Sequence, residues 1–221
     1  MWAQRFLFER MVEVRKIILI QHCQSEHHIN NMSGGWTDTP LTDLGRKQAD
    51  LVGLSLINTL DHDAYTLYSS DLLRAKQTAE IVGSHLNLQV IEDSNLREIN
   101  TGIAAGKTKD WIRDNRNPRI GSDFDMDYQE FQEGETWREF YSRICCCMER
   151  ICNTEEKDLI IVTHGGTLAY IIAWWMNFQP QMLSKAYFSA SVGSISILNQ
   201  NSYKQNVLSV LNDTAHLSLL I

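Results

Sequence analysis

The chain has 221 residues, 43% hydrophobic and 21% charged, which is typical of a soluble globular protein with one substantial core. Its formal net charge of −7 argues against a nucleic-acid groove or an anionic membrane surface, because both require clustered lysine and arginine side chains. No apolar stretch reaches the ~18 residues that would span a bilayer. We therefore expect neither a nucleic-acid partner nor a membrane partner.

The segment that precedes the first expected strand shows no secretory signal. Residues 1–10, MWAQRFLFER, lack a continuous apolar core and a small-residue cleavage site. An odd number of cysteines, five, is typical of free thiols in a reducing compartment, and the run Cys145-Cys146-Cys147 matches none of the familiar spacings of a metal site. We interpret residues 1–221 as a single domain with an N-terminal extension at 1–14, located in the cytoplasm.

The first half of the chain alternates between strand and helix patterns. The aliphatic run KIILIQ predicts a buried strand at 16–21. A helical period predicts a helix at 42–59, with Thr42 as its N-cap, and AYTLYS predicts a strand at 64–69. An amphipathic helix is expected at 71–86 and a short strand at 88–91.

The second half begins with an irregular segment at about 100–134, with a short helix expected around 107–115. The period of the apolar residues then predicts a long helix at 135–152. DLIIVTH predicts a second buried strand at 158–164, after which Gly165 and Gly166 are expected to turn the chain into a helix at 167–176. Strands are expected at 194–198 and 206–211. This alternation predicts an α/β fold with a mainly parallel central sheet between helical layers.

Four side chains form a candidate site. His22 and His164 end the two most aliphatic strands, and ligands of open α/β sheets bind at the carboxyl ends of strands. Two imidazoles there suit a phosphoryl group, because one can attack it while the other donates to its oxygens. Arg74 lies in the first turn of its helix, where a cation is favourable only beside an anion. Glu98, with a raised pKa, would protonate a leaving alkoxide.

The motifs around these residues resemble those of the histidine phosphatase superfamily, also called the phosphoglycerate mutase-like family. The matching segments follow the family order and run from about residue 16 to 216: QHCQSEHH, GGWTDTPLTDLG, YSSDLLRAKQTAE, NLREINTG, GETWREFYSRI and VTHGG. The resemblance implies a three-layer αβα sandwich in which residues 100–134 form a lid. It also implies a metal-independent phosphatase that needs no cofactor.

The resemblance further implies a role for each site residue. His22 would become phosphohistidine, Arg74 and His164 would bind the phosphoryl oxygens, and Glu98 would act as general acid and then as general base. Ser25 and the backbone at Gly165 would help to hold the phosphate. The expected partner is a small phosphorylated substrate or inorganic phosphate, and a homodimer is left open.

Three positions depart from the family pattern. Gln21 stands where the family has arginine, Cys23 follows the nucleophile where the family has glycine, and His28 stands where many members have asparagine. Glutamine can still donate a hydrogen bond to phosphate but brings no charge. We expect weakened catalysis, partly compensated if His28 is protonated below neutral pH. We expect Cys23 to pack in the interior.

Three interpretations of the function stay open. A phosphomonoesterase is favoured over a phosphoglycerate mutase, because the stretch between Arg119 and Arg138 contains acids and no cation and would repel a doubly phosphorylated intermediate. A catalytically impaired member that only binds phosphorylated ligands, as a sensor or scaffold, is the alternative that Gln21 suggests. Aromatic residues suggest apolar contact with the substrate: Trp36, Trp111, Phe124, Tyr128 and Phe131.

Overall fold

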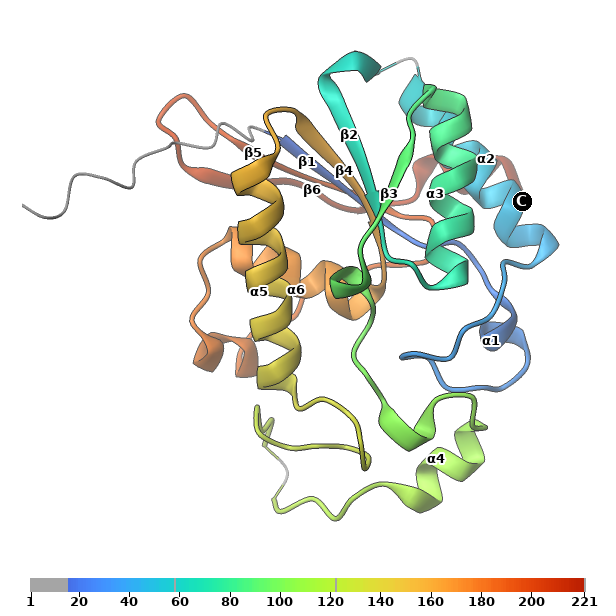
Figure 1. The fold of residues 1–221 in the computed structure, drawn as a ribbon, viewed down its shortest axis with the longest axis vertical. Coiled ribbons are helices and arrows are strands. Elements are labelled where there is room, and N and C mark those ends of the chain that lie inside the picture. Colours follow the sequence, from blue (N-terminus) through green and yellow to red (C-terminus); the bar gives the residue numbers. More distant parts are fainter. Residues whose placement is uncertain (1–15, 58, 122, 221) are drawn as a thin grey trace, which may run out of the picture.

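A six-stranded sheet lies at the centre of the molecule (Figure 1). The computed structural model describes residues 16–57, 59–121 and 123–220, so the expected N-terminal extension lies outside the described residues. The strand order is β3-β2-β4-β1-β5-β6; the first four strands are parallel, and β5 and β6 are antiparallel to their neighbours. The strands are β1 (Lys16–Gln21), β2 (Tyr65–Ser69), β3 (Val90–Glu92), β4 (Asp158–Thr163), β5 (Ile195–Gln200) and β6 (Asn206–Asp213).

Both faces of the sheet are covered because its central strands are aliphatic on both sides. In β1, Ile17 and Leu19 pack into one core cluster, while Ile18 and Ile20 pack into a second cluster on the opposite face. Helices α5 and α6 cover the first face and α2 and α3 the second (Figure 1). The three-layer αβα sandwich is therefore confirmed. The helices are α2 (Asp43–Ile57), α3 (Leu73–Leu86), α5 (Trp137–Thr154) and α6 (Gly165–Trp175).

Several local predictions needed correction. The glycines Gly165 and Gly166 do not form a turn before the last long helix; they are its first two residues. Strand β3 begins two residues later than expected, and a four-residue helix, α1 (Glu26–Ile29), was not predicted. Thr42 does act as a cap, since its Oγ1 accepts a hydrogen bond from the amide of Gly45 at 3.0 Å. Short 3₁₀ helices occur at His62–Ala64, Ser94–Leu96, Gly102–Ala104, Pro180–Ser184 and Ala215–Leu220.

The irregular segment 100–134 contains the expected short helix, α4 (Lys109–Asn115). Thr108 pairs with Met32 in an isolated bridge, and the amide of Lys109 donates to the carbonyl of Asn31 at 2.9 Å. These contacts join the segment to the loop that follows α1, at the same end of the molecule (Figure 1). Its action as a lid stays a prediction. Among the residues described, no helix is both long and apolar enough to cross a membrane.

Candidate active site

His22 follows β1 directly and is held by the backbone on both sides. Its amide donates to the carbonyl of Thr163 in β4 at 2.8 Å. Its ring Nδ1 donates to the carbonyl of Cys23 at 2.8 Å, which leaves Nε2 as the acceptor. Only 4% of the residue is exposed, and burial, followed by the charge of Arg74, holds the pKa of His22 well below its usual value. The imidazole is therefore neutral near pH 7, as a nucleophile must be.

Arg74 is the second residue of α3 and brings a buried guanidinium to His22. Its Nε donates to His22 Nε2 at 3.1 Å, and its terminal nitrogens donate to the carbonyls of Thr37, at 2.6 Å, and Gly35, at 2.7 Å. These bonds use three of the five N–H donors of a guanidinium and leave two for a ligand. Burial lowers the pKa of Arg74 to about 10, so the side chain remains charged at neutral pH.

His164 caps the N-terminus of α6 beside His22, with the ring centroids 5.1 Å apart. Its Nε2 lies 2.8 Å from Ser70 Oγ, which itself accepts from the amide of Leu72 at 3.3 Å. If the Ser70 hydroxyl donates to His164 Nε2, the ring proton of His164 lies on Nδ1. That Nδ1 is buried without a protein partner at the N-terminus of α6, so in this tautomer it is a donor that a bound anion could use.

Glu98 lies against the same helix end. Its Oε2 accepts from the amide of Gly166 at 2.9 Å and its Oε1 from the amide of Ile99 at 3.0 Å. A Cβ atom on residue 166 would stand 2.4 Å from Glu98 Oε1. A side chain at residue 166 would therefore push the Glu98 carboxyl group away from its present position. Burial raises the pKa of Glu98 despite these two hydrogen bonds, as a general acid requires.

The geometry places His22, Arg74, His164 and Glu98 around one end of the sheet, and comparison with known proteins decides what this arrangement is. The model of the histidine phosphatase superfamily, branch 1, matches residues 17–214, which is more than half of the chain. The chain belongs to this superfamily. Its members are metal-independent phosphomonoesterases related to phosphoglycerate mutase, which is the class that the sequence predicted.

Individual relatives of this histidine phosphatase include phosphatases and mutases. It is 27% identical over 209 residues to Broad-specificity phosphatase YOR283W of Saccharomyces cerevisiae, covering 91% of this chain and 87% of the relative. It is 37% identical over 103 residues to 2,3-bisphosphoglycerate-dependent phosphoglycerate mutase of Bartonella henselae, covering 45% of this chain and 49% of the relative. Mycobacterial glucosyl-3-phosphoglycerate phosphatase Rv2419c, solved with VO3, shares the fold with a TM-score of 0.76 at 23% identity, covering 90% and 100% of the chains.

A cluster of histidines on α1 adjoins His22. Ser25 is fully buried; its amide donates to His28 Nδ1 at 3.0 Å and its Oγ lies 2.9 Å from His27 Nδ1. The His28 ring stacks 5.6 Å from that of His22. Burial and then the charge of Arg74 lower the pKa of His28, so this ring takes up a proton at a lower pH than a free histidine does. Contact of Ser25 or His28 with phosphate stays a prediction.

Sequence reasoning missed two residues of this cluster and its surroundings. His27 is 7% exposed and packs 4.0 Å from His28, between ring centroids. Helix α1 has four residues, which is too short for a periodic pattern to reveal it. Ser70, which orients His164, lies in a sequence that reads as an ordinary strand end. The pairing of β2 with β4 brings Ser70 to His164, whereas His27 lies near His22 because it follows it by five residues on the short helix α1.

Two of the departures from the family pattern can now be placed. Gln21 is nearly buried and its Oε1 has no hydrogen-bond partner. A Cβ atom on Gly165 would lie 3.3 Å from that oxygen, so the amide of Gln21 faces the N-terminus of α6. Gly165 and Gln21 stay predicted phosphate contacts. Cys23 packs in the interior, and burial raises the pKa of its thiol to about 12, so it is not a reactive thiolate.

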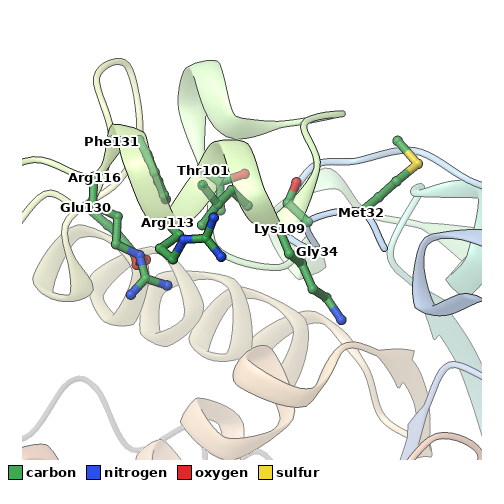
Figure 2. A pocket seen from close by; sticks show the side chains of 10 residues that line it. Met32, Gly34, Thr101, Lys109, Arg113, Arg116, Glu130 and Phe131 are labelled. Carbon is green, nitrogen blue, oxygen red and sulfur yellow. The ribbon is translucent and has the colours of Figure 1, made fainter. Parts of the chain in front are cut away.

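The charges of the segment 100–134 differ from the expectation. Two of the acids are paired with arginines: Asp127 pairs with Arg138 of α5 at 2.6 Å, and Glu130 pairs with Arg116 of the same segment at 2.8 Å. A recess of about 540 Å³ on this segment is lined by Lys109, Arg113 and Arg116 (Figure 2). Repulsion of a second phosphate by this segment is therefore weaker than the sequence suggested. Within the described ranges, no cluster of three or more His, Cys, Asp or Glu side chains could hold a metal ion.

Proposed function

We propose that this histidine phosphatase hydrolyses a small phosphorylated metabolite in the cytoplasm through a phosphohistidine on His22. The observation that carries the proposal is the arrangement of the two imidazoles and the guanidinium. His22 Nε2 faces Arg74 Nε at 3.1 Å, and the ring centroid of His164, whose Nδ1 is buried without a partner, lies 5.1 Å from that of His22. A phosphoryl group in this space would meet a neutral nucleophile and several positively polarised donors.

In the first step, His22 Nε2 attacks phosphorus and the bond from phosphorus to the ester oxygen breaks. Glu98 gives its proton to the departing oxygen, so the alcohol leaves neutral. Arg74 exchanges its bond to His22 for bonds to the phosphoryl oxygens, and His164 donates from Nδ1. These preorganised donors stabilise the charge that spreads over the phosphoryl oxygens in the transition state.

In the second step, water attacks the phosphorus of phospho-His22. The carboxylate of Glu98 takes a proton from that water, the bond from phosphorus to nitrogen breaks, and inorganic phosphate is released. Glu98 is then protonated again, ready for the next substrate. The hydrogen bond from His22 Nδ1 to the carbonyl of Cys23 holds the ring in one tautomer through both steps.

The test is hydrolysis of p-nitrophenyl phosphate near pH 6, with release of inorganic phosphate as a second readout. We expect turnover in the parent chain and an acid-labile, base-stable phosphoryl label on the protein during turnover. The His22→Ala variant should lose both signals. The His85→Ala variant is the matched control, because His85 lies on α3 and pairs with Asp50, away from the site. Equal activity in His22→Ala and the parent would refute the proposal.

Two alternatives are favoured by specific observations. The recess lined by Lys109, Arg113 and Arg116, together with the mutase relatives, favours phosphoglycerate mutase activity. The uncharged Gln21 favours a member of the family that binds phosphate with little turnover. Conversion of 3-phosphoglycerate in the presence of its bisphosphate would establish the mutase. Phosphate binding without turnover in the parent and in Gln21→Arg would establish the sensor.

A further inference from the structure

A second recess, of about 460 Å³, has four aromatic residues among the eight that line it. We call it the aromatic recess. Its walls come from the segment 100–134, from the N-terminus of α5, from α6 and from the loop that follows α6. The residues that carry the argument are Phe124, Trp137, Tyr170, Lys185 and Tyr187. Its volume is in the range of sites that bind small molecules.

The inner wall of the aromatic recess is rigid and the outer wall is open. Tyr170 is 3% exposed, and its ring lies 4.9 Å from that of Phe140 and 6.4 Å from that of Trp137, between centroids. Phe124 packs on Trp137 at 5.7 Å yet is 37% exposed, and Tyr187 is 60% exposed. Two large rings are thus presented to solvent at the mouth of a preformed apolar wall, where a planar group could stack on them.

The aromatic recess begins about one helical turn from the carboxyl group of Glu98. Gly166 donates its amide to Glu98, and Tyr170 follows four residues later on the same face of α6, about 6 Å along the axis. Burial and then the charge of Glu98 raise the pKa of the Tyr187 hydroxyl to about 12. The proposed general acid therefore lies next to the wall of the recess that α6 forms.

We propose that the aromatic recess binds the leaving alcohol of the substrate, and that this alcohol carries a planar ring or a comparable apolar group. The inference rests on the proposed function, in which the attacking nitrogen of His22 and the departing oxygen lie roughly in line through phosphorus. Glu98 protonates that oxygen, so the rest of the alcohol extends beyond Glu98 and away from His22. The aromatic recess, whose wall includes Tyr170 one helical turn after Gly166, is the cavity that we assign to it.

The recess lined by Lys109, Arg113 and Arg116 is less suited to the leaving group. Its cations are largely paired within the protein, since Arg113 bonds Asp110 at 3.1 Å and Arg116 bonds Glu130 at 2.8 Å. A small polar alcohol such as glycerate would also leave the rings of Phe124 and Tyr187 uncovered. An apolar alcohol removes their surface from water, and Lys185 at the rim can meet a polar substituent.

The experiment compares two substrates whose alcohols have similar acidity, 2-(1-naphthyl)ethyl phosphate and ethyl phosphate. We expect kcat/KM for the naphthyl ester to exceed that for the ethyl ester by roughly fiftyfold, from the apolar area that the ring buries. The variants Tyr187→Ala and Phe124→Ala should each lower this ratio by about fivefold to tenfold. Tyr187→Phe, which keeps the ring, should restore it. The control is Tyr203→Ala, at an 83% exposed tyrosine between β5 and β6.

A binding measurement separates this inference from the proposed function. Calorimetry with 2-(1-naphthyl)ethylphosphonate and ethylphosphonate, which cannot be hydrolysed, should show the same preference and the same losses in the two alanine variants. If the protein shows no turnover but still binds the naphthyl compound more tightly, with losses in the two alanine variants, the recess is supported and the proposed phosphatase activity is refuted. The assignment of the recess is overturned, and the proposed function kept, if turnover depends on His22 but the naphthyl and ethyl compounds are used equally well. It is also overturned if the ratio of their kcat/KM values is unchanged in Tyr187→Ala and Phe124→Ala.

Discussion

Replacing Gln21 by arginine should raise the activity of this histidine phosphatase. Gln21 Oε1 is buried without a partner and lies beside Gly165 at the end of α6, where the phosphoryl group is proposed to bind. A neutral hydrogen bond contributes about 0.5–1.5 kcal/mol and a charge-assisted one about 1.5–3 kcal/mol. The difference of about 1–2 kcal/mol corresponds to a fivefold to thirtyfold gain in kcat/KM for Gln21→Arg.

The same substitution should destabilise the free protein, because it adds a second cation near the buried Arg74. We expect a lower Tm for Gln21→Arg without ligand, and a larger Tm increase on addition of inorganic phosphate than in the parent. The Gln21→Leu variant is the control: it should keep its Tm, since no protein hydrogen bond to Oε1 is lost, and should lose activity. If Gln21→Arg folds, yet kcat/KM and the phosphate-induced Tm shift equal those of the parent, residue 21 does not face the phosphoryl group.

Three further predictions concern protons. Glu98→Gln should lower kcat for an alkyl phosphate by roughly 10²–10⁴ and that for p-nitrophenyl phosphate by less. The rate for the alkyl ester should decline as pH rises through the raised pKa of Glu98, and the variant should not show this decline. Equal losses for both esters would argue against general acid catalysis. Ser70→Ala should lower kcat about tenfold with little change in KM, because His164 loses the bond that fixes its tautomer; an unchanged kcat would contradict that role. Folding lowers the pKa of His27 from 6.5 to about 3, so as pH falls the unfolded chain takes up a proton before the folded protein does. The free energy of unfolding should therefore decrease as pH falls from about 6.5, by about 1–2 kcal/mol at pH 5 after allowance for solvent screening. Urea titrations in which the His27→Asn variant keeps the full dependence on pH would refute this.

The strand ends could be predicted because their sequences carry a strong local signal. KIILIQ and DLIIVT are too aliphatic to lie anywhere but in a covered sheet, so the positions of His22 and His164 followed from periodicity. Arg74 was identified because a cation in the first turn of a helix is unfavourable unless an anion lies beside it. These signals lie within a few residues of the side chain concerned.

Features that depend on contacts between distant segments could not be read in this way. Asp127 pairs with Arg138 of α5 and Glu130 with Arg116, which follows α4, and no sequence pattern reveals these pairings. The repulsion that the acids of this segment exert was therefore overestimated. The glycine at position 166 suggested a turn because flexibility is its commonest use. Here the absence of a side chain admits Glu98, which is 68 residues away in the sequence.

The position of β4 in the sheet has a consequence for synthesis of the chain. His22 and Arg74 are translated early, but their strands β1 and β2 are not neighbours; β4, which brings His164, pairs with both and separates them. Until residues 158–163 have emerged from the ribosome, the nascent chain has no strand β4 to pair with both β1 and β2. Chains that end before residue 158 would therefore lack both β4 and His164 and could not complete the candidate site around His22.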